Sequence, residues 1–101
     1  MNNITKVSDI QVSDLTEYLN LPDAMIGDMN EISNYLNIAK HFISDYTAIP
    51  MDELDTVPTF VECVFVLVQD LYDTRALYVD KTNINKVVAS ILNGHRRNYV
   101  Y

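Results

Sequence analysis

The stretch from Pro58 to Arg75 limits the possible folds more than any other part of the chain, because it is long, strongly apolar and free of glycine. Proline fits the first turn of a helix, where its missing N–H leaves no hydrogen bond unmade. Acidic residues precede Pro58 and Arg75 closes the stretch, so the charges suit a helix dipole in this direction. The apolar side chains are Phe60, Val61, Cys63, Val64, Phe65, Val66, Leu67, Val68, Leu71 and Tyr72. They cover most directions around a helix axis, which is the pattern of a buried helix.

A buried strand is the alternative for the middle of this stretch. Val64–Val68 is rich in β-branched and aromatic residues, which favour strands. However, the whole stretch is long for a strand and ordinary for a helix. Helical spacing also returns at its end, where Leu67, Leu71 and Tyr72 share one side. We therefore predict a helix over 58–75.

A second helix, over 25–48, is predicted by the most regular pattern in the chain. Apolar residues recur there in steps of four and three, which places them on one helical face. This face consists of Met25, Met29, Ile32, Leu36, Ala39, Ile43 and Tyr46, widened by Phe42 and Ile49. Pro50 ends the helix, and an acidic loop is expected over 51–57. The chain needs this face for its own core, packed on the 58–75 helix.

Two shorter helices complete the predicted fold. Ser13 is a good N-cap for a helix over 13–20, which ends before Pro22. A last helix is expected near 84–93, with Gly94 as its C-terminal cap. Its apolar residues lie at helical spacing and are Ile84, Val87, Val88, Ile91 and Leu92. The sequence therefore predicts an all-α fold, a small helical bundle of three main helices plus a short C-terminal helix.

The two ends of the chain differ from this helical body, which covers residues 10–94. Residues 1–9 are polar and patternless, and we expect a flexible N-terminal arm there. Residues 95–101 form a basic and aromatic C-terminal tail. A chain of 101 residues with 49% apolar content is expected to form one globular domain with a small core. No apolar run reaches the length of a membrane span, no secretory signal is evident, and one cysteine excludes an internal disulfide framework.

Charge is divided unevenly along the chain, whose formal net charge is −7. Residues 1–74 contain 13 acidic and 2 basic side chains, whereas residues 75–101 contain 5 basic side chains and 1 acidic one. Nucleic-acid binding depends on Lys and Arg that neutralise phosphates, so the acidic body is a poor candidate for it. The basic end can instead pair with an acidic protein surface, including that of an identical neighbour.

No group of residues in the sequence predicts catalysis. Cys63 lies in the most apolar run without a neighbouring His or Lys, so we expect a buried and inert thiol. His41 and Asp45 share a helical face, but two weak ligands do not make a metal site. The two glycines, Gly27 and Gly94, cannot supply a glycine-rich phosphate loop. We therefore expect a protein that is not an enzyme and that uses no cofactor or metal.

Three segments resemble the small head–tail connector proteins of tailed phages, which complete the head and take part in DNA packaging. The central helix ends in a motif similar to that family's signature, Leu71-Tyr72-Asp73-Thr74-Arg75. Val12–Leu21 resembles the family's opening helix, which is acidic, capped and ends in Tyr-Leu. Leu92–Arg97 resembles the end of its closing helix and the start of its basic, aromatic tail. The resemblance covers residues 10–97 and keeps the family's order.

The resemblance implies a structural virion protein that is made in the host cytoplasm and is located at the head–tail junction. It implies a homo-oligomeric ring of about a dozen copies beneath the portal. Such a ring completes the head after DNA packaging, contacts the portal protein and the tail-side connector proteins, and lets DNA pass without sequence-specific binding. The alternative is an acidic helical regulator or inhibitor that binds a host protein.

Candidate interface residues lie in the basic C-terminal part of the chain. They are Arg75, Leu77, Tyr78, Arg96, Arg97, Tyr99 and Tyr101. The loop 76–82 either packs back on the core or meets a partner. Arg75 either caps the carbonyls of its helix or pairs with a neighbour's carboxylate. Leu71 and Tyr72 are structural residues of the signature, and Tyr72 is expected to bury its ring.

Overall fold

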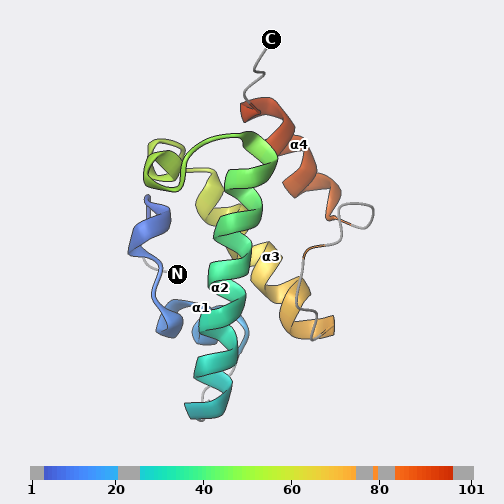
Figure 1. Ribbon diagram of the computed structural model, residues 1–101. Helices are drawn as coiled ribbons and strands as arrows, with labels where there is room; N and C mark the ends of the chain where they lie inside the picture. Colours follow the sequence, from blue (N-terminus) through green and yellow to red (C-terminus); the bar gives the residue numbers. More distant parts are fainter. Residues whose placement is uncertain (1–3, 21–25, 75–78, 80–83, 97–101) are drawn as a thin grey trace.

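The computed structural model describes residues 4–20, 26–74, 79 and 84–96, and every regular element in these ranges is helical. In chain order the elements are η1 Val7–Asp9, α1 Val12–Tyr18, α2 Ile26–Thr47, η2 Met51–Thr56, α3 Phe60–Thr74 and α4 Lys86–His95, where η marks a 3₁₀ helix (Figure 1). The prediction of an all-α small bundle is therefore confirmed. The strand considered for Val64–Val68 does not form, because these residues lie inside α3.

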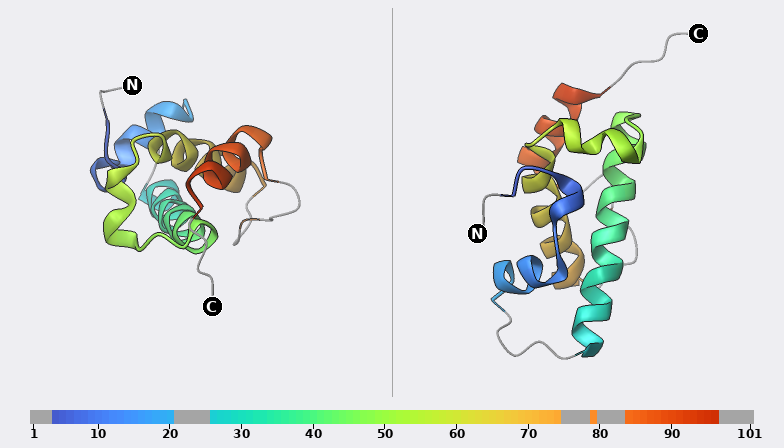
Figure 2. Two further views of the ribbon diagram at one scale, coloured as in Figure 1. Left: turned by 90° about the horizontal axis from the view of Figure 1, so that it is seen from above. Right: turned by 90° about the vertical axis from the view of Figure 1, so that its left-hand side faces the viewer.

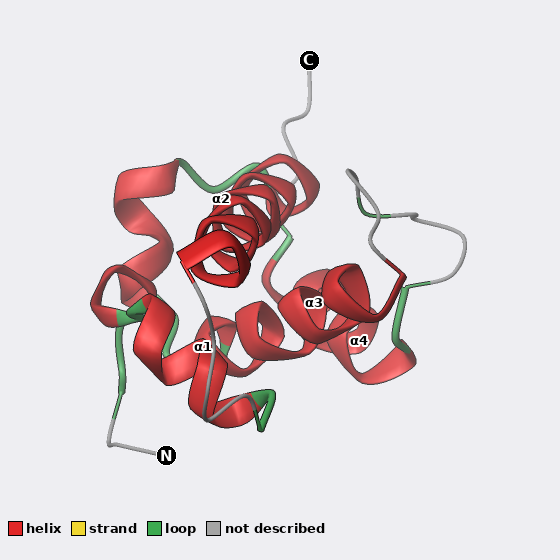
Figure 3. Ribbon diagram, turned by 90° about the horizontal axis from the view of Figure 1, so that it is seen from below, coloured by secondary structure: helices red, strands yellow, loops and turns green. Residues whose placement is uncertain are grey.

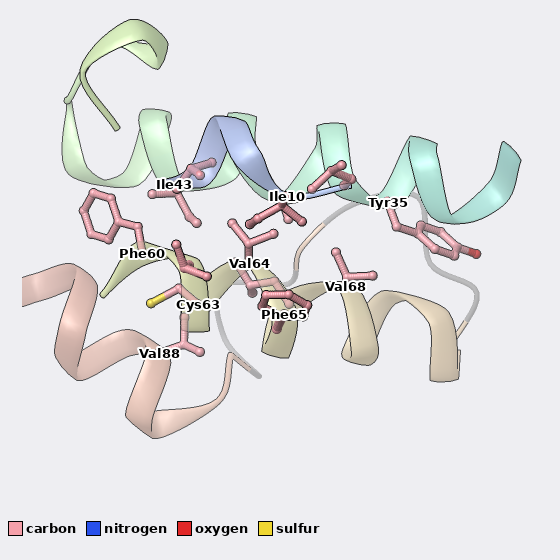
Figure 4. Close-up of a cluster of buried hydrophobic side chains, with 14 of the residues drawn as sticks. Ile10, Tyr35, Ile43, Phe60, Cys63, Val64, Phe65, Val68 and Val88 are labelled. Atoms are coloured by element: carbon pink, nitrogen blue, oxygen red, sulfur yellow. The ribbon is translucent and has the colours of Figure 1, made fainter. Parts of the chain in front are cut away.

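The core lies mainly between the two long helices, α2 and α3, which run side by side (Figure 1). α3 buries a broad face that contains most of its apolar side chains, but Glu62, Gln69 and Asp70 are exposed, so the prediction of burial nearly all round is too broad. From α2, the buried side chains are Ile32, Tyr35, Leu36, Ala39 and Ile43, and Figure 4 shows Tyr35 and Ile43 directed at α3. The predicted apolar face of α2 is too long at its start, because Met29 is 42% exposed.

The shorter elements cover opposite sides of this pair. α1, η1 and η2 pack on one side, and α4 packs on the other against both α3 and α2 (Figures 2 and 3). Val88 and Leu92 are the fully buried side chains of α4, whereas Val87 points outward and is 67% exposed. The helical spacing of the apolar residues in this segment therefore includes one, Val87, that is not part of the core. None of the described helices combines the length and the apolar character needed to cross a membrane.

The N-terminal segment belongs to the packed body from residue 4 onward. Val7 and Ile10 are buried in the core. The backbone N–H of Ser8 donates to Asp55 Oδ1 at 2.9 Å, and Ser8 Oγ donates to Asp55 Oδ2 at 2.6 Å. These two bonds join η1 to η2, so the expectation of a flexible arm over 1–9 is wrong for residues 4–9. The sequence misses this packing because two apolar side chains in a polar run show no periodicity.

Several predicted boundaries move by one or two residues. α1 begins at Val12 with Gln11 as its N-cap, and the Gln11 N–H donates to Asp14 Oδ2 at 2.8 Å, so Ser13 lies inside the helix and does not cap it. α4 continues through Gly94 to His95, so Gly94 is not the C-terminal cap. The acidic loop expected over 51–57 is mostly the 3₁₀ helix η2, which buries Leu54.

Candidate functional site

Leu71 and Tyr72, near the end of α3, both contribute to the packing of the bundle. Leu71 is buried in the core. Tyr72 is half-buried, and its ring meets the ring of Tyr35 on α2 edge to face, with centroids 6.5 Å apart. Edge-to-face pairs of this kind add to the stabilisation that burial provides. The structural role expected for Leu71 and Tyr72 agrees with this packing, while Arg75 lies outside the described residues.

The end of α4 is attached to α2 and α3 by a group of aromatic contacts. Tyr46 Oη donates to Asn93 Oδ1 at 2.8 Å, and the guanidinium carbon of Arg96 lies 5.5 Å from the centroid of the Tyr46 ring. The His95 ring meets Phe60 edge to face at 5.4 Å. We call Tyr46, Phe60, Asn93, His95 and Arg96 the tail anchor. The tail predicted from residue 95 therefore begins only after this anchor, because His95 belongs to α4.

Most of the candidate interface residues cannot be placed on this framework. Arg96 is exposed and takes part in the tail anchor. The others lie outside the described residues and are Arg75, Leu77, Tyr78, Arg97, Tyr99 and Tyr101. Within the loop 76–82, Val79 is half-buried and packs against the core. At this position the loop follows the first of its two expected alternatives, packing on the core.

The environment of Cys63 agrees with the expected inert thiol. The side chain is fully buried, and burial together with the nearby Glu62 carboxylate raises the pKa of the thiol to about 11. A nucleophilic cysteine needs the opposite shift, because the thiolate is the reactive form. His41 and Asp45 both lie on α2, and no group of three or more potential metal ligands occurs within the described ranges.

Two carboxyl groups have pKa values that depart from the ordinary one in opposite directions. The hydrogen bonds from the Ser8 side chain and backbone lower the pKa of Asp55. Burial, and then repulsion from Asp73, raises the pKa of Asp70 near the end of α3. The first carboxylate connects two 3₁₀ helices, whereas burial and the neighbouring Asp73 make the charged form of the second less favourable.

Two exposed apolar side chains have charged neighbours of opposite sign. Val87 follows the exposed Lys86 at the start of α4, and no acidic residue lies in that first turn. Met51 is 40% exposed at the start of η2 and precedes the exposed Asp52. The sequence alone did not identify Val87 as an exposed residue, because it fits the helical spacing of its apolar neighbours. The signal that could have drawn attention to it is Lys86 beside it, in the first turn of a helix, where a positive charge is unfavourable.

Comparison with known proteins adds nothing to this picture, since no protein-family model, curated protein or solved structure matches the chain.

Proposed function

We propose that this chain is a structural virion protein, a head–tail connector that forms a ring beneath the portal of a tailed phage. The observation that carries the proposal is the position of the signature-like motif near the end of the central helix, where Leu71 is buried in the core and Tyr72 packs against Tyr35 of α2. The other two similar segments fall on α1 and on the end of α4. The three segments therefore lie on helices of one small bundle.

The surface chemistry supports the same function. Before Arg75 the chain is strongly acidic, so a ring of such subunits presents carboxylates to DNA and does not hold it. In this proposal the ring completes the head after packaging, offers a channel for DNA and provides a surface for tail attachment. Contacts with the portal and with tail-side proteins come from the basic C-terminal part of the chain.

The test uses the purified chain and the portal protein of the same phage. The mixture is separated by gel filtration and imaged by electron microscopy. We expect a ring of this protein bound to the portal assembly. An acidic regulator or inhibitor instead forms a discrete complex with a host protein and leaves the portal unchanged, which is the outcome that would refute the connector function.

A variant lacking residues 97–101 tests the role of the tail. Because Tyr46, Asn93, His95 and Arg96 remain, the melting temperature should stay within about 2 °C of the full chain. Binding to the portal should be lost. If the shortened chain still binds the portal with unchanged affinity, the tail is not the contact element.

A further inference from the structure

We propose that the start of α4 in one copy docks on η2 of the next copy, so that successive subunits join head to tail. The contact deepens the proposed function and rests on it for the ring, although the contact itself can be measured without any portal protein. It is carried by the two exposed apolar side chains, Val87 and Met51, and by their charged neighbours.

The start of α4 presents an exposed apolar side chain and an exposed lysine at the surface of the described part of the subunit. Val87 is 67% exposed, and Ile91, one helical turn further on the same face, is half-buried. Lys86 is exposed in the first turn of α4, where the helix dipole disfavours a positive charge and where the turn itself contains no acidic residue. A carboxylate from another molecule would offset the unfavourable interaction between Lys86 and the helix dipole. An apolar side chain from the same molecule would cover Val87 and remove it from water. We call Lys86, Val87 and Ile91 the α4 patch.

The start of η2 has the complementary character. Met51 is 40% exposed, and the carboxylate of Asp52 beside it is exposed as well. Asp55, on the same short helix, is already engaged by Ser8 through both carboxylate oxygens. Glu53 is half-buried, so Asp52 is the exposed carboxylate of η2 and the one suited to an incoming lysine. Methionine is a flexible side chain that adapts to a neighbouring surface, which suits a contact point. We call Met51 and Asp52 the η2 patch.

The fold places these two patches on opposite sides of the subunit. Figure 2, seen from above, shows η2 on one side of the α2–α3 pair and α4 on the other, and Figure 1 shows the same separation. One copy can therefore offer its α4 patch to one neighbour and its η2 patch to another. A contact between two different patches is heterologous, and repeated heterologous contacts give a closed ring or an open filament.

Charge decides between this arrangement and a symmetric dimer. If two α4 patches face each other, the Lys86 side chains of the two subunits lie at the same contact. If two η2 patches face each other, the two Asp52 side chains do. Both arrangements place like charges together at the contact and are disfavoured. The α4 patch against the η2 patch places Lys86 beside Asp52 and Val87 beside Met51, which is the pairing that satisfies both charge and apolar contact.

The test is charge reversal, measured by sedimentation velocity over a series of concentrations of the full chain at about 50 mM salt, where screening is weak. We expect K86E and D52K each to weaken self-association about tenfold or more, because each places like charges at the contact. The K86E/D52K double variant restores the attraction with reversed signs and should associate as the wild type does. An equimolar mixture of the two single variants should also associate, because alternating copies satisfy every contact.

D73K is the matched control, because Asp73 is an exposed carboxylate near the end of α3 and the substitution changes the charge by the same amount. D52K and D73K both bring the net charge closer to zero, so reduced overall repulsion favours association in both. A loss of association in D52K but not in D73K therefore isolates the η2 patch. Far-UV circular dichroism and thermal melting should show that all variants keep the fold.

Three results would overturn the contact: a wild-type chain that stays monomeric at every concentration, a D52K variant that associates normally, or a double variant that fails to recover. If K86E loses association while D52K keeps it, α4 has another partner, and this result also counts against the proposed contact. Portal binding is scored separately. Charge rescue without portal binding refutes the connector function and leaves the contact standing, whereas portal binding without charge rescue does the reverse.

Discussion

Ala48 has a backbone conformation that an alanine rarely adopts. Its φ of 60° follows the last residue of α2, a position where helices commonly use glycine. Hydrogen bonds around it fix the turn: Ser44 Oγ donates to the Ile49 carbonyl at 2.6 Å, and the buried Thr47 Oγ1 donates to the Ile43 carbonyl at 2.6 Å. The turn delivers Ile49 into the core, so the strain at Ala48 is balanced by burial.

Replacing Ala48 with glycine should therefore stabilise the protein. We expect the free energy of unfolding to rise by about 0.5–1 kcal/mol, since the left-handed conformation costs alanine more than the added chain entropy costs glycine. Urea denaturation gives the comparison. The control is A89G, within α4, which should lose about 1 kcal/mol as glycine normally does inside a helix. Equal losses in both variants would contradict the prediction.

The pair Ser8 and Asp55 predicts a dependence of stability on pH. The hydrogen bonds from Ser8 lower the pKa of Asp55 in the folded state. Their stabilising contribution is therefore complete above the ordinary carboxyl pKa and is lost as the pH falls through the lowered one. S8A should reduce the free energy of unfolding by about 0.5–1 kcal/mol near pH 7, and this difference should shrink in acid.

Urea denaturation of S8A and of the wild type, repeated at several pH values, tests this prediction. T16A is the control, because Thr16 Oγ1 donates to the Ser13 carbonyl, which does not titrate. Its effect should not change with pH. A pH-independent loss in S8A would mean that the charge of Asp55 contributes nothing through this contact.

At the scale of elements, the sequence predicts the long helices well and their surroundings poorly. α2 and α3 follow from continuous apolar patterns, and their ends lie within two residues of the predicted ones. η1 could not be predicted, because Val7 is buried by contacts with η2 and α3 that lie far away in sequence. The direction of Val87 was also beyond reach, since a stripe of apolar residues does not show where the buried part of a helix face ends.

The contribution of α3 to the core can be measured with one pair of variants. Leu67 is fully buried on α3, so L67A should cost about 2–5 kcal/mol of unfolding free energy by leaving a cavity. V87A is the control, because the side chain is mostly exposed, and it should change stability by less than about 0.5 kcal/mol. Chemical denaturation monitors both variants. A loss below about 0.5 kcal/mol in L67A would mean that the core is misplaced.

At the scale of the whole molecule, the candidate site was only partly predictable. Sequence resemblance drew attention to Leu71, which is buried in the core, and to Tyr72, which meets Tyr35 between α2 and α3. The tail anchor was missed, because its contacts join Tyr46 and Phe60 to a helix more than thirty positions away. The two patches on α4 and η2 were missed for a related reason: exposure on opposite sides of a bundle is a property of the packed chain and has no local pattern.

The charge of the whole molecule predicts very weak binding to free duplex DNA. With 14 acidic and 7 basic residues, the chain has few groups that can release counterions from phosphates, and repulsion dominates. We expect no measurable binding by fluorescence anisotropy of a labelled duplex at about 150 mM salt. K86E should behave in the same way. Submicromolar binding that disappears steeply with added salt would show that the basic C-terminal part governs contact with DNA.

The position of Cys63 gives the molecule a built-in reporter of its own opening motions. It is the chain's one cysteine, and its side chain is fully enclosed by the core. A thiol reagent such as Ellman's reagent can reach it only when that core opens, and in the opened chain the pKa returns from about 11 toward its ordinary value. When reclosing is fast, the labelling rate divided by the rate in the denatured chain equals the equilibrium constant for opening, and its logarithm gives the free energy of opening. For the proposed assembly, the same rate measured in free and in associated copies tells how far association rigidifies the core, and no new cysteine has to be introduced.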